Sequence, residues 1–414
     1  MKRNIVFIRK ESRVIPWLFS LSWEQRKVGD ILSDVERPIA MLDDETYQLV
    51  TVKRRNEGIV SRGYLKGKDI LVKNYYRIHE GDFLISKRQV IHGANGYVPK
   101  NLDNAVVSNE YMVAVSNNDI STAFWALMSQ RKEMYQMYLF SSYGVDVEKM
   151  VFNVDDWKKR SVIIPKLEEQ TAIVSFFSKL DNLITLHQRK YTKLMNIKKS
   201  MLDKMFPKDG ASVPEIRFAG FTDAWEQRKL SEACENFEYG LNAAAKEYDG
   251  ANKYIRITDI DDISRTFSTV DLTSPDICLD GMSKYLLSAG DIVFARTGAS
   301  VGKTYIYKEK DGTVYFAGFL IRTKVRPEYD SEFIFQNTLT TNYEKYVRIT
   351  SQRSGQPGVN AQEYGEYMFF APSKKEQVRI GKFLRELDDL ITLHQRELER
   401  LQNIKKSCLE KMFV

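Results

Sequence analysis

The sequence predicts an α+β protein with two globular domains separated by two long helices, arranged as an internal pseudo-twofold repeat. Residues 180–190 (LDNLITLHQRK) return as 387–397 (LDDLITLHQRE), and residues 196–206 (NIKKSMLDKMF) return as 403–413 (NIKKSCLEKMF). Both matches have the same offset of 207 (387 − 180 and 403 − 196). Before each copy, short β-branched and aromatic runs mix with helical patterns without strict alternation, which favours α+β over α/β domains.

The composition is that of an ordinary globular protein, and it predicts neither a cofactor nor a metal site. Of 414 residues, 43% are hydrophobic and 28% are charged, and no apolar run is long enough to span a membrane. The three cysteines share no spacing with one another or with the four histidines, which predicts reduced thiols in the cytoplasm. The net charge of +7 suits a nucleic-acid partner if the basic residues are clustered.

The repeat extends into the globular parts and divides the chain into six segments. The sequence Trp-Glu-Gln-Arg-Lys at residues 23–27 returns at 225–229, and a Gly-Asp turn precedes an apolar strand at Gly81 and again at Gly290. The offsets drift to 202 and 209, so the globular parts have diverged more than the helices. We expect an atypical N-terminal segment (1–22), a first globular domain (23–162), a first helical region (163–207), a linker (208–216), a second globular domain (217–371) and a second helical region (372–414).

Within each domain, β-branched and aromatic runs predict strands, and longer periodic segments predict helices. Strands are expected at Tyr47–Val52, Asp82–Ser86 and Val106–Val115, and at Tyr254–Thr258, Asp291–Arg296 and Val314–Val325. One helix is expected at Ser121–Tyr138 and its counterpart at Ser331–Tyr346. Ser373 and Glu376 match a Ser-x-x-Glu capping box, which would start the second long helix.

Each long helix carries an apolar seam with the heptad spacing of a coiled coil. The seam residues are Ile173, Phe177, Leu180, Ile184, His187, Tyr191 and Leu194 in the first helix, and Ile380, Leu384, Leu387, Ile391, His394, Leu398 and Leu401 in the second. A helix of about 38 residues is about 57 Å long, more than the diameter of either domain. The two seams are therefore expected to pack against each other; the alternative is that each packs on its own globular domain.

Taken together, these features resemble the specificity subunit of a type I restriction–modification enzyme. The resemblance rests on the repeated helices between variable domains, the Trp-Glu-Gln-Arg-Lys openings, the Pro-x-x-x-Glu-Gln helix starts and residues 290–303 (GDIVFARTGASVGK). It implies a non-catalytic subunit whose two target recognition domains sit on an antiparallel helix pair and each read one half of a split DNA site. It also implies two modification (methyltransferase) subunits as partners, and restriction/translocase subunits in the full complex. Residues 214–225 match the family's lead-in to a recognition domain, whereas residues 12–23 match it poorly.

In an antiparallel pair, His187 and His394 would face each other, because each lies near the middle of its helix. One polar pair in an otherwise apolar seam would fix the register of the two helices. The alternative is that both rings point outward, to solvent or to a partner subunit.

No catalytic motif is complete in the sequence. Residues 298–304 (GASVGKT) resemble a P-loop, but three residues separate the glycines where four are required, so a glycine turn between two strands is the expected structure. The Asp-Pro-Pro-Tyr and Asn-Pro-Pro-Tyr motifs of adenine methyl transfer are missing. Pro275-Asp276 is not followed by an acidic-x-Lys sequence of a nuclease before residue 311.

Basic and amide side chains in loops supply the donors that DNA reading requires. In the first domain the expected DNA-binding residues are Lys53, Arg54, Arg55, Arg62, Lys87, Arg88, Gln89 and Asn95. In the second domain they are Arg256, Arg296, Thr297, Ser300, Lys303, Gln352, Arg353, Ser354, Gln356 and Asn360. The alternative for each of these loops is a plain solvated turn.

The sequence thus favours a DNA-sequence-reading scaffold that binds double-stranded DNA and two modification subunits in the cytoplasm, without a membrane segment. A coiled-coil adaptor that joins two protein partners without reading DNA is the alternative, and an enzyme acting alone on DNA ranks third. Basic loops in both globular halves favour the reader.

Overall fold

The computed structural model describes residues 23–208, 210–353 and 355–413, and the chain divides into two compact units. The first unit comprises Met1–Thr185 and Glu399–Val414, and the second comprises Leu186–Leu398. Each unit therefore contains one globular part together with a segment of both long helices, α6 (Leu167–Lys204) and α11 (Lys374–Lys411). The predicted segment 1–22 lies outside the described residues.

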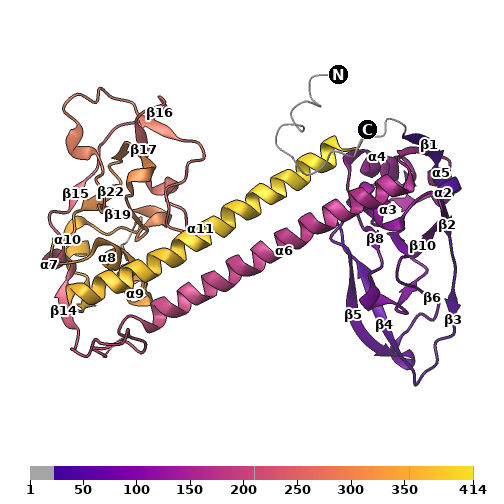
Figure 1. The fold of residues 1–414 in the computed structure, drawn as a ribbon, viewed down its shortest axis with the longest axis horizontal. Coiled ribbons are helices and arrows are strands. Elements are labelled where there is room, and N and C mark those ends of the chain that lie inside the picture. The colour runs from indigo at the N-terminus through magenta and orange to yellow at the C-terminus, as the bar shows by residue number, and fades with distance from the viewer. Residues whose placement is uncertain (1–22, 209, 354, 414) are drawn as a thin grey trace. The chain divides into compact units, whose positions relative to one another are not determined.

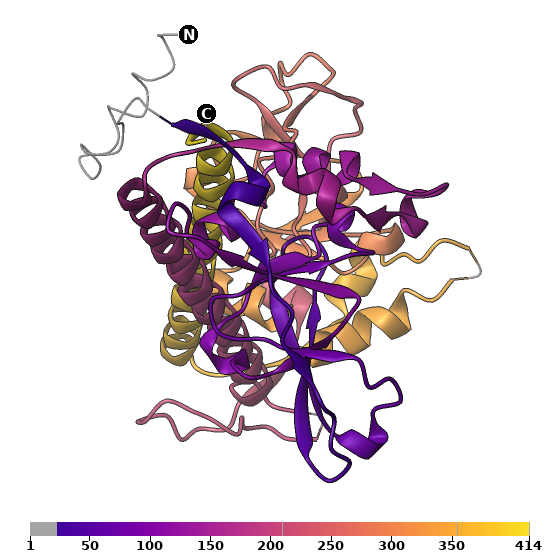
Figure 2. The same ribbon diagram turned by 90° about the vertical axis from the view of Figure 1, so that its right-hand side faces the viewer.

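Two larger sheets, two pairs of strands and a group of short helices form the globular part of the first unit (Figure 1). One sheet has the strand order β2-β10-β7-β8, and the other has the order β3-β6-β9-β4-β5. The hairpin of β4 and β5 projects from this unit away from α6 (Figures 1 and 2). The elements are β1 (Glu24–Lys27), α2 (Val28–Ile31), β2 (Leu32–Asp34), β3 (Pro38–Ile39), β4 (Thr46–Val52), β5 (Ile59–Lys66), β6 (Tyr75–Arg77), β7 (Phe83–Ser86), β8 (Asn95–Tyr97), β9 (Val106–Ser108), β10 (Tyr111–Ser116), α3 (Thr122–Met128), α4 (Lys132–Phe140), β11 (Ser142–Tyr143), β12 (Val151–Phe152), α5 (Val154–Lys158) and β13 (Ser161–Ile164).

The second unit repeats this plan with different connections. Its four-stranded sheet has the order β15-β22-β19-β20, and β17 pairs with β21 in parallel. The elements are β14 (Glu226–Lys229), α7 (Leu230–Ala233), β15 (Glu238–Tyr239), β16 (Ala245–Glu247), β17 (Lys253–Ile255), β18 (Thr273–Pro275), β19 (Ile292–Ala295), β20 (Thr304–Ile306), β21 (Val314–Phe316), β22 (Leu320–Thr323), α8 (Ser331–Asn337), α9 (Thr341–Thr350), α10 (Ala361–Gly365) and β23 (Met368–Ala371).

The repeated Trp-Glu-Gln-Arg-Lys sequence has the same structural role in both units. Its last four residues form a strand that pairs antiparallel with the strand just before the long helix, with Glu24 opposite Ile164 and Glu226 opposite Ala371. The opening of each globular part is thereby fixed to its end, which closes the domain next to the helix.

Four predicted elements are each two elements in the structure. The strand expected at Val106–Val115 is β9 and β10, and that expected at Val314–Val325 is β21 and β22; in both cases the two strands belong to different sheets. The helix expected at Ser121–Tyr138 is α3 and α4, and its counterpart is α8 and α9. These predictions were wrong about continuity, although the positions of the segments were right.

Short polar side chains explain the break between α8 and α9. The hydroxyl of Thr338 donates to the carbonyl of Phe335 (2.6 Å) and lies 2.7 Å from the hydroxyl of Thr304. The hydroxyl of Thr340 then accepts from the N–H of Tyr343 and caps α9. Threonine side chains that bond to nearby backbone groups offer the chain an alternative to continuing the helix.

The repeated glutamine at each long-helix start ties the helix to its globular part. The Gln170 amide donates to the carbonyl of Pro165 (2.9 Å), and its oxygen accepts from the N–H of Ser121 (2.9 Å). Gln377 makes the equivalent bonds to Pro372 (2.8 Å) and Asp330 (3.0 Å). Both glutamines are buried, so these bonds are sheltered from water.

The glutamate before each of these glutamines also binds its own globular part. Both carboxylate oxygens of Glu376 accept from Arg217 (2.7 and 2.8 Å), and this contact replaces the predicted capping box with Ser373. Glu169 instead accepts from the indole N–H of Trp23 (3.3 Å). In both units, the Glu-Gln pair therefore attaches the start of the long helix to the globular part.

The two long helices form an antiparallel coiled coil, as predicted. In the second unit, His187 of α6 meets His394 of α11, whereas the later residue Lys198 of α6 pairs with the earlier residue Asp388 of α11. In the first unit, Asp181 of α6 pairs with Lys405 of α11 (2.7 Å), which is the same ion pair with the helices exchanged. All predicted seam residues are buried or half-buried.

The ends of the seams also pack into the globular cores. The alternative, that each seam packs on its own globular domain, is therefore correct for these ends. Ile173 and Phe177 of α6 share a core with Phe413, which follows α11. Ile380 and Leu384 of α11 share the other core, against which the half-buried Leu194 of α6 packs. Each helix is therefore anchored in a core at its start and paired with the other helix further along.

Candidate nucleic-acid interface

The two units share a backbone frame at the end of their central buried strand. In the first unit, Lys87 follows β7, and its N–H donates to the carbonyl of Glu110 (3.0 Å). In the second unit, Arg296 follows β19, and its N–H donates to the carbonyl of Phe319 (3.0 Å). The same backbone position therefore presents a different basic side chain in each unit.

Residues 54–56 of the first unit form a strained turn. Arg55 and Asn56 both have left-handed backbone conformations, with φ of 60° and 54°. Such conformations cost non-glycine residues about 1–3 kcal/mol each and persist only where the surroundings hold them. Here the N–H groups of Arg55 and Asn56 donate to the carbonyls of His92 (2.7 Å) and Gly93 (2.9 Å), and the Tyr135 hydroxyl donates to the Asn56 side chain.

Asn95 supports this turn and does not reach the surface. Its side chain is 1% exposed, and its amide oxygen accepts from the amide of Asn56 (3.0 Å). The expectation that Asn95 contacts DNA is corrected: the glycines beside it made the segment look like a loop, but Asn95 begins strand β8.

The predicted basic residues of the first unit lie mainly at the surface, and several pair with an acidic neighbour. Lys53, Arg54, Arg55, Arg62 and Arg88 are exposed, whereas Lys87 and Gln89 are half-buried. Arg54 pairs with Glu148 (3.1 Å) and Arg88 with Glu110 (2.7 Å), while the Lys87 ammonium donates to the carbonyl of Asn109 (2.9 Å). Exposed ion pairs contribute little to stability, so these side chains can leave their acidic partners at small cost.

In the second unit, the segment that resembles a P-loop is a turn between two paired strands, as the sequence predicted. It connects β19 to β20, which pair antiparallel, whereas a P-loop leads into a helix. Gly302 has a φ of 82°, and a Cβ atom there would lie 2.5 Å from Val347, so both the conformation and the space require glycine. The hydroxyl of Tyr364 accepts from the N–H of Gly302 (3.1 Å) and donates to the carbonyl of Ala295 (2.7 Å).

Two residues of this turn do not offer free side chains. Ser300 is 9% exposed, so the expectation that it contacts DNA is corrected. Lys303 is 16% exposed at its side chain and forms an ion pair with Asp262. Thr297 remains half-buried at the start of the turn, where its hydroxyl lies 3.4 Å from the carbonyl of Pro357.

The loop after α9 packs against this turn. Thr297 and Gly358 form a β-bridge, and the N–H of Gly298 donates to the carbonyl of Pro357 (3.0 Å). Gln352, Gln356 and Asn360 of this loop are exposed, whereas Ser351 at the end of α9 is buried. Arg353 pairs with Glu363 (2.5 Å), and Asn360 caps α10 through the N–H of Glu363 (2.9 Å). Ser354 lies outside the described residues.

Arg296 and Arg256 differ in their surroundings. The Arg256 guanidinium makes two bonds to the carboxylate of Asp259 (2.9 and 2.8 Å), which also accepts from its N–H. Arg296 has no acidic partner within the described residues, and its guanidinium instead lies over two rings. Its Cζ is 5.0 Å from the ring centroid of Tyr239 and 5.6 Å from that of Phe319. Sequence reasoning missed both aromatic residues, because it searched for basic and amide side chains.

Burial shifts the pKa of two groups in the second unit, Asp291 and Tyr364. It raises the pKa of the Asp291 carboxyl at the start of β19, although the N–H of Ser288 donates to it and Arg322 lies 3.7 Å away. It also raises the pKa of the Tyr364 hydroxyl under the glycine turn. Both groups act as hydrogen-bond partners for the backbone, and neither faces a hollow of the second unit described below.

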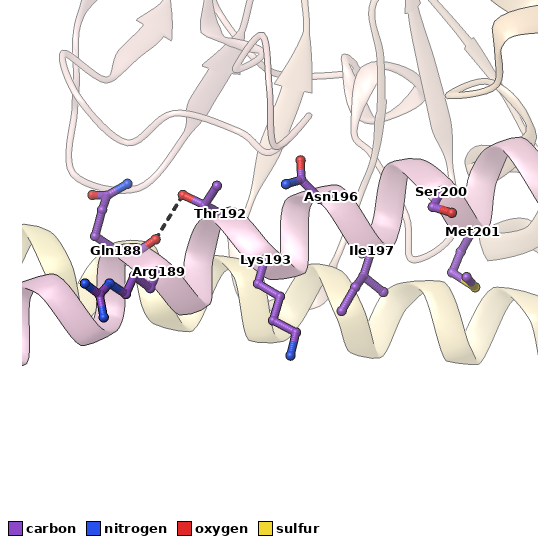
Figure 3. Close-up of a pocket in the computed structure, with 8 residues that line it drawn as sticks. All are labelled: Gln188, Arg189, Thr192, Lys193, Asn196, Ile197, Ser200 and Met201. Carbon is purple, nitrogen blue, oxygen red and sulfur yellow. Dashed lines mark hydrogen bonds between the residues drawn. The ribbon is translucent and has the colours of Figure 1, made fainter.

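The second unit contains two open hollows that are lined mainly by amide, hydroxyl, basic and apolar side chains. One of about 570 Å³ follows a face of α6 (Figure 3), where the hydroxyl of Thr192 donates to the carbonyl of Gln188 (3.0 Å). The other, of about 540 Å³, is lined by residues 206–208 and 210–212 and by residues of α9 and β23. Carboxylate, imidazole and thiol groups are missing from both linings. Across the described ranges, no three histidine, cysteine or acidic residues gather as a metal site, and no helix could span a membrane.

Comparison with known proteins gives one consistent family. The model of the type I restriction modification DNA specificity domain matches residues 21–196 and again residues 222–403. The type I restriction enzyme MjaVIII specificity subunit of Methanocaldococcus jannaschii is 23% identical over 407 residues, which cover 94% of this chain and 91% of that protein.

Solved structures of similar proteins cover nearly the whole chain. The crystal structure of the type I restriction–modification system S subunit from M. genitalium has a TM-score of 0.61 at 15% identity, and covers 96% of this chain and 98% of its own. The HsdS subunit from Thermoanaerobacter tengcongensis has a TM-score of 0.45 at 15% identity, with the same coverage of 96% and 98%. The first of these likenesses supports the fold of two repeated domains on paired helices.

Proposed function

Because this chain belongs to the type I restriction–modification DNA specificity domain family, and is therefore a DNA sequence-recognition subunit, we propose that each globular part reads one half of a bipartite site. The observation that carries this proposal is the repeated frame at Lys87 and Arg296. The backbone bonds are the same in both units, while the side chains that the frame presents differ. A common scaffold with different surface donors is suited to reading two different base sequences.

The basic loops supply the affinity in this proposal, and a smaller set of side chains supplies the sequence preference. Lys53, Arg54, Arg55 and Arg62 extend along the projecting β4–β5 hairpin and its turn. Contacts of such side chains to phosphate position a protein on the duplex without reading its sequence. Paired arginines such as Arg88 and Arg353 can exchange a glutamate for phosphate, because their ion pairs are exposed.

The coiled coil would set the distance between the two half-sites and dock two modification subunits. This role is supported by the anchoring of each helix start in its own core, through Gln170 and Gln377. Exposed leucines on the helices, Leu183 and Leu186 in α6 and Leu390 and Leu393 in α11, leave apolar surface for protein partners. The chain would itself be non-catalytic: methyl transfer to adenine belongs to the modification subunits, and DNA cleavage in the cytoplasm to restriction/translocase subunits.

Mapping of methylated adenine tests this proposal directly. The chain and its modification partner would be expressed together in a host without other methyltransferases, and the genome would be sequenced with a method that detects N6-methyladenine. We expect one motif of two fixed half-sites separated by an unread spacer of constant length. If the chain were only an adaptor, the methylated adenines would lie at the same positions with and without it. That result would overturn the proposal.

A further inference from the structure

We propose that Arg296, whose guanidinium lies over the rings of Tyr239 and Phe319 (together called the clamp), is the residue of the second unit that reads a guanine in the major groove. This inference rests on the proposed function and assigns a base to one position of the second half-site. The side chains concerned come from three neighbouring strands of one sheet, because the order β15-β22-β19 brings the end of β15, the start of β22 and the end of β19 together.

The clamp leaves the hydrogen-bonding edge of the guanidinium available. Rings stacked on the faces of an arginine attract its charge without using its in-plane donors. Tyr239 and Phe319 are 44% and 56% exposed, so the two rings extend to the surface together with the arginine. Among the described residues, Arg296 has no carboxylate partner, in contrast to Arg256, Arg322 and Arg353. Its Nε atom is buried without a hydrogen-bond partner, so the free donors are those of the terminal nitrogens.

The backbone of Arg296 is held from both sides. Its N–H donates to the carbonyl of Phe319 (3.0 Å), and its carbonyl accepts from the N–H of Val359 (2.9 Å). Its side chain therefore starts from a fixed point at the end of a fully buried strand, and two rings restrict its rotation. A guanidinium held in this way loses little entropy on binding and can make the paired bonds to O6 and N7 that distinguish guanine from other bases.

The first unit lacks this clamp in the same frame. Lys87 occupies the equivalent position, with its carbonyl bonded to the N–H of Phe152 (2.8 Å) as that of Arg296 is to Val359. Glu110 stands where the second unit has Phe319, and it pairs with Arg88. Lysine is a point donor without the planar fork. The two units therefore present different side chains to a base at equivalent positions. These are Lys87 and Glu110 in the first unit, and Arg296 and Phe319 in the second.

The test compares Arg296→Lys, Arg296→Gln and Phe319→Leu with the control Arg348→Gln, which removes an exposed arginine of the same unit on α9. Each full-length variant would be expressed with the modification partner, and its thermal unfolding would be recorded to check that it folds. Its methylated motif would then be mapped, and its affinity would be measured for matched duplexes and for duplexes with one base pair substituted. We expect the wild-type second half-site to contain a guanine that Arg296→Lys and Arg296→Gln no longer require. Discrimination at that base should fall about 5- to 150-fold, the value of one good bidentate contact, while the first half-site stays unchanged.

Phe319→Leu keeps the charge and loosens the clamp, so it should weaken the same base preference by a smaller factor than Arg296→Gln. If Arg296→Gln lowers affinity equally for all sequences and reduces the salt dependence by one contact, Arg296 binds phosphate and the inference is wrong. A wild-type second half-site without guanine, or an unchanged motif in both Arg296 variants, would also overturn it. Only the absence of any bipartite motif in the wild type would count against the proposed function itself.

Discussion

At the scale of single residues, the structure shows which polar side chains are buried and bonded within the protein. Asn95 and Ser300 are buried, although their glycine-rich neighbourhoods suggested surface loops. Tyr239 and Phe319 lie at the surface beside Arg296, although the sequence analysis assigned neither of them to the DNA-binding surface. Burial of this kind depends on which strands become neighbours, and a local sequence pattern contains no information about that.

The pairing of His187 and His394 was predictable, because both lie at equivalent heptad positions. Their Nδ1 atoms are 3.1 Å apart, and the ring centroids are 5.1 Å apart. Such a bond needs one Nδ1–H donor and one unprotonated Nδ1 acceptor, so protonation of both rings breaks it. Burial, followed by the charges of His187 and Lys190, lowers the pKa of His394 from its usual value of 6.5.

The lowered pKa of His394 gives this pair a pH-dependent contribution to stability. A histidine whose folded pKa lies below its unfolded pKa stabilises the fold fully above the unfolded value, and the contribution is lost as pH falls toward the folded value. Replacing both histidines by leucine should therefore raise the melting temperature more at about pH 5.5 than at about pH 8. Equal shifts at both pH values, measured by differential scanning fluorimetry, would show that the pair does not titrate as described.

The two repeated ion pairs offer a second residue-scale prediction with an internal control. Lys198 and Asp388 are 10% and 18% exposed at their side chains, and Asp388 also accepts from Gln336 (2.8 Å). The equivalent Lys405 and Asp181 are 25% and 49% exposed. Asp388→Ala leaves a buried ammonium unpaired and should cost roughly 2–4 kcal/mol of unfolding free energy, whereas Asp181→Ala should cost less than about 1 kcal/mol. Denaturant unfolding of both variants checks the ranking, and similar losses would refute the assignment of one pair as buried.

At the scale of elements, the long helices were predictable and their short neighbours were only partly so. A heptad seam repeated over two copies fixes both the type and the pairing of α6 and α11. The break between α8 and α9 depends on Thr338 and Thr340 bonding to their own backbone, and on Thr338 meeting Thr304 from a strand distant in sequence. The contact between Thr338 and Thr304 exists only in the folded unit, so a local sequence pattern cannot predict it.

The helices also carry the prediction for the spacer. Inserting one heptad after Thr192, with a matching heptad after Glu399 in α11, keeps the seam in phase and adds about 10 Å of helix. If the coiled coil sets the half-site distance, the unread spacer of the methylated motif should lengthen by about three base pairs. Insertion after Thr192 alone places the two seams out of step and should abolish binding. A motif with an unchanged spacer in the doubly extended chain would contradict the ruler role.

At the scale of the whole molecule, the repeat explains why the two globular parts can diverge while the chain keeps one function. Each part is closed by its own strand pair, β1 with β13 and β14 with β23, and each is tied to its helix by the same glutamine. Changes in the loops of one unit therefore leave the other unit and the coiled coil intact. Because the units are independent in this way, we expect them to read their half-sites separately.

Replacement of residues 23–162 by the corresponding domain of another family member tests that claim most directly. The chimeric chain would be expressed with the modification partner, and methylated adenines would be mapped across the genome beside those of the wild type. We expect a motif in which one half-site is new, while the other half-site and the spacer length are retained. A motif in which both half-sites change together would contradict it.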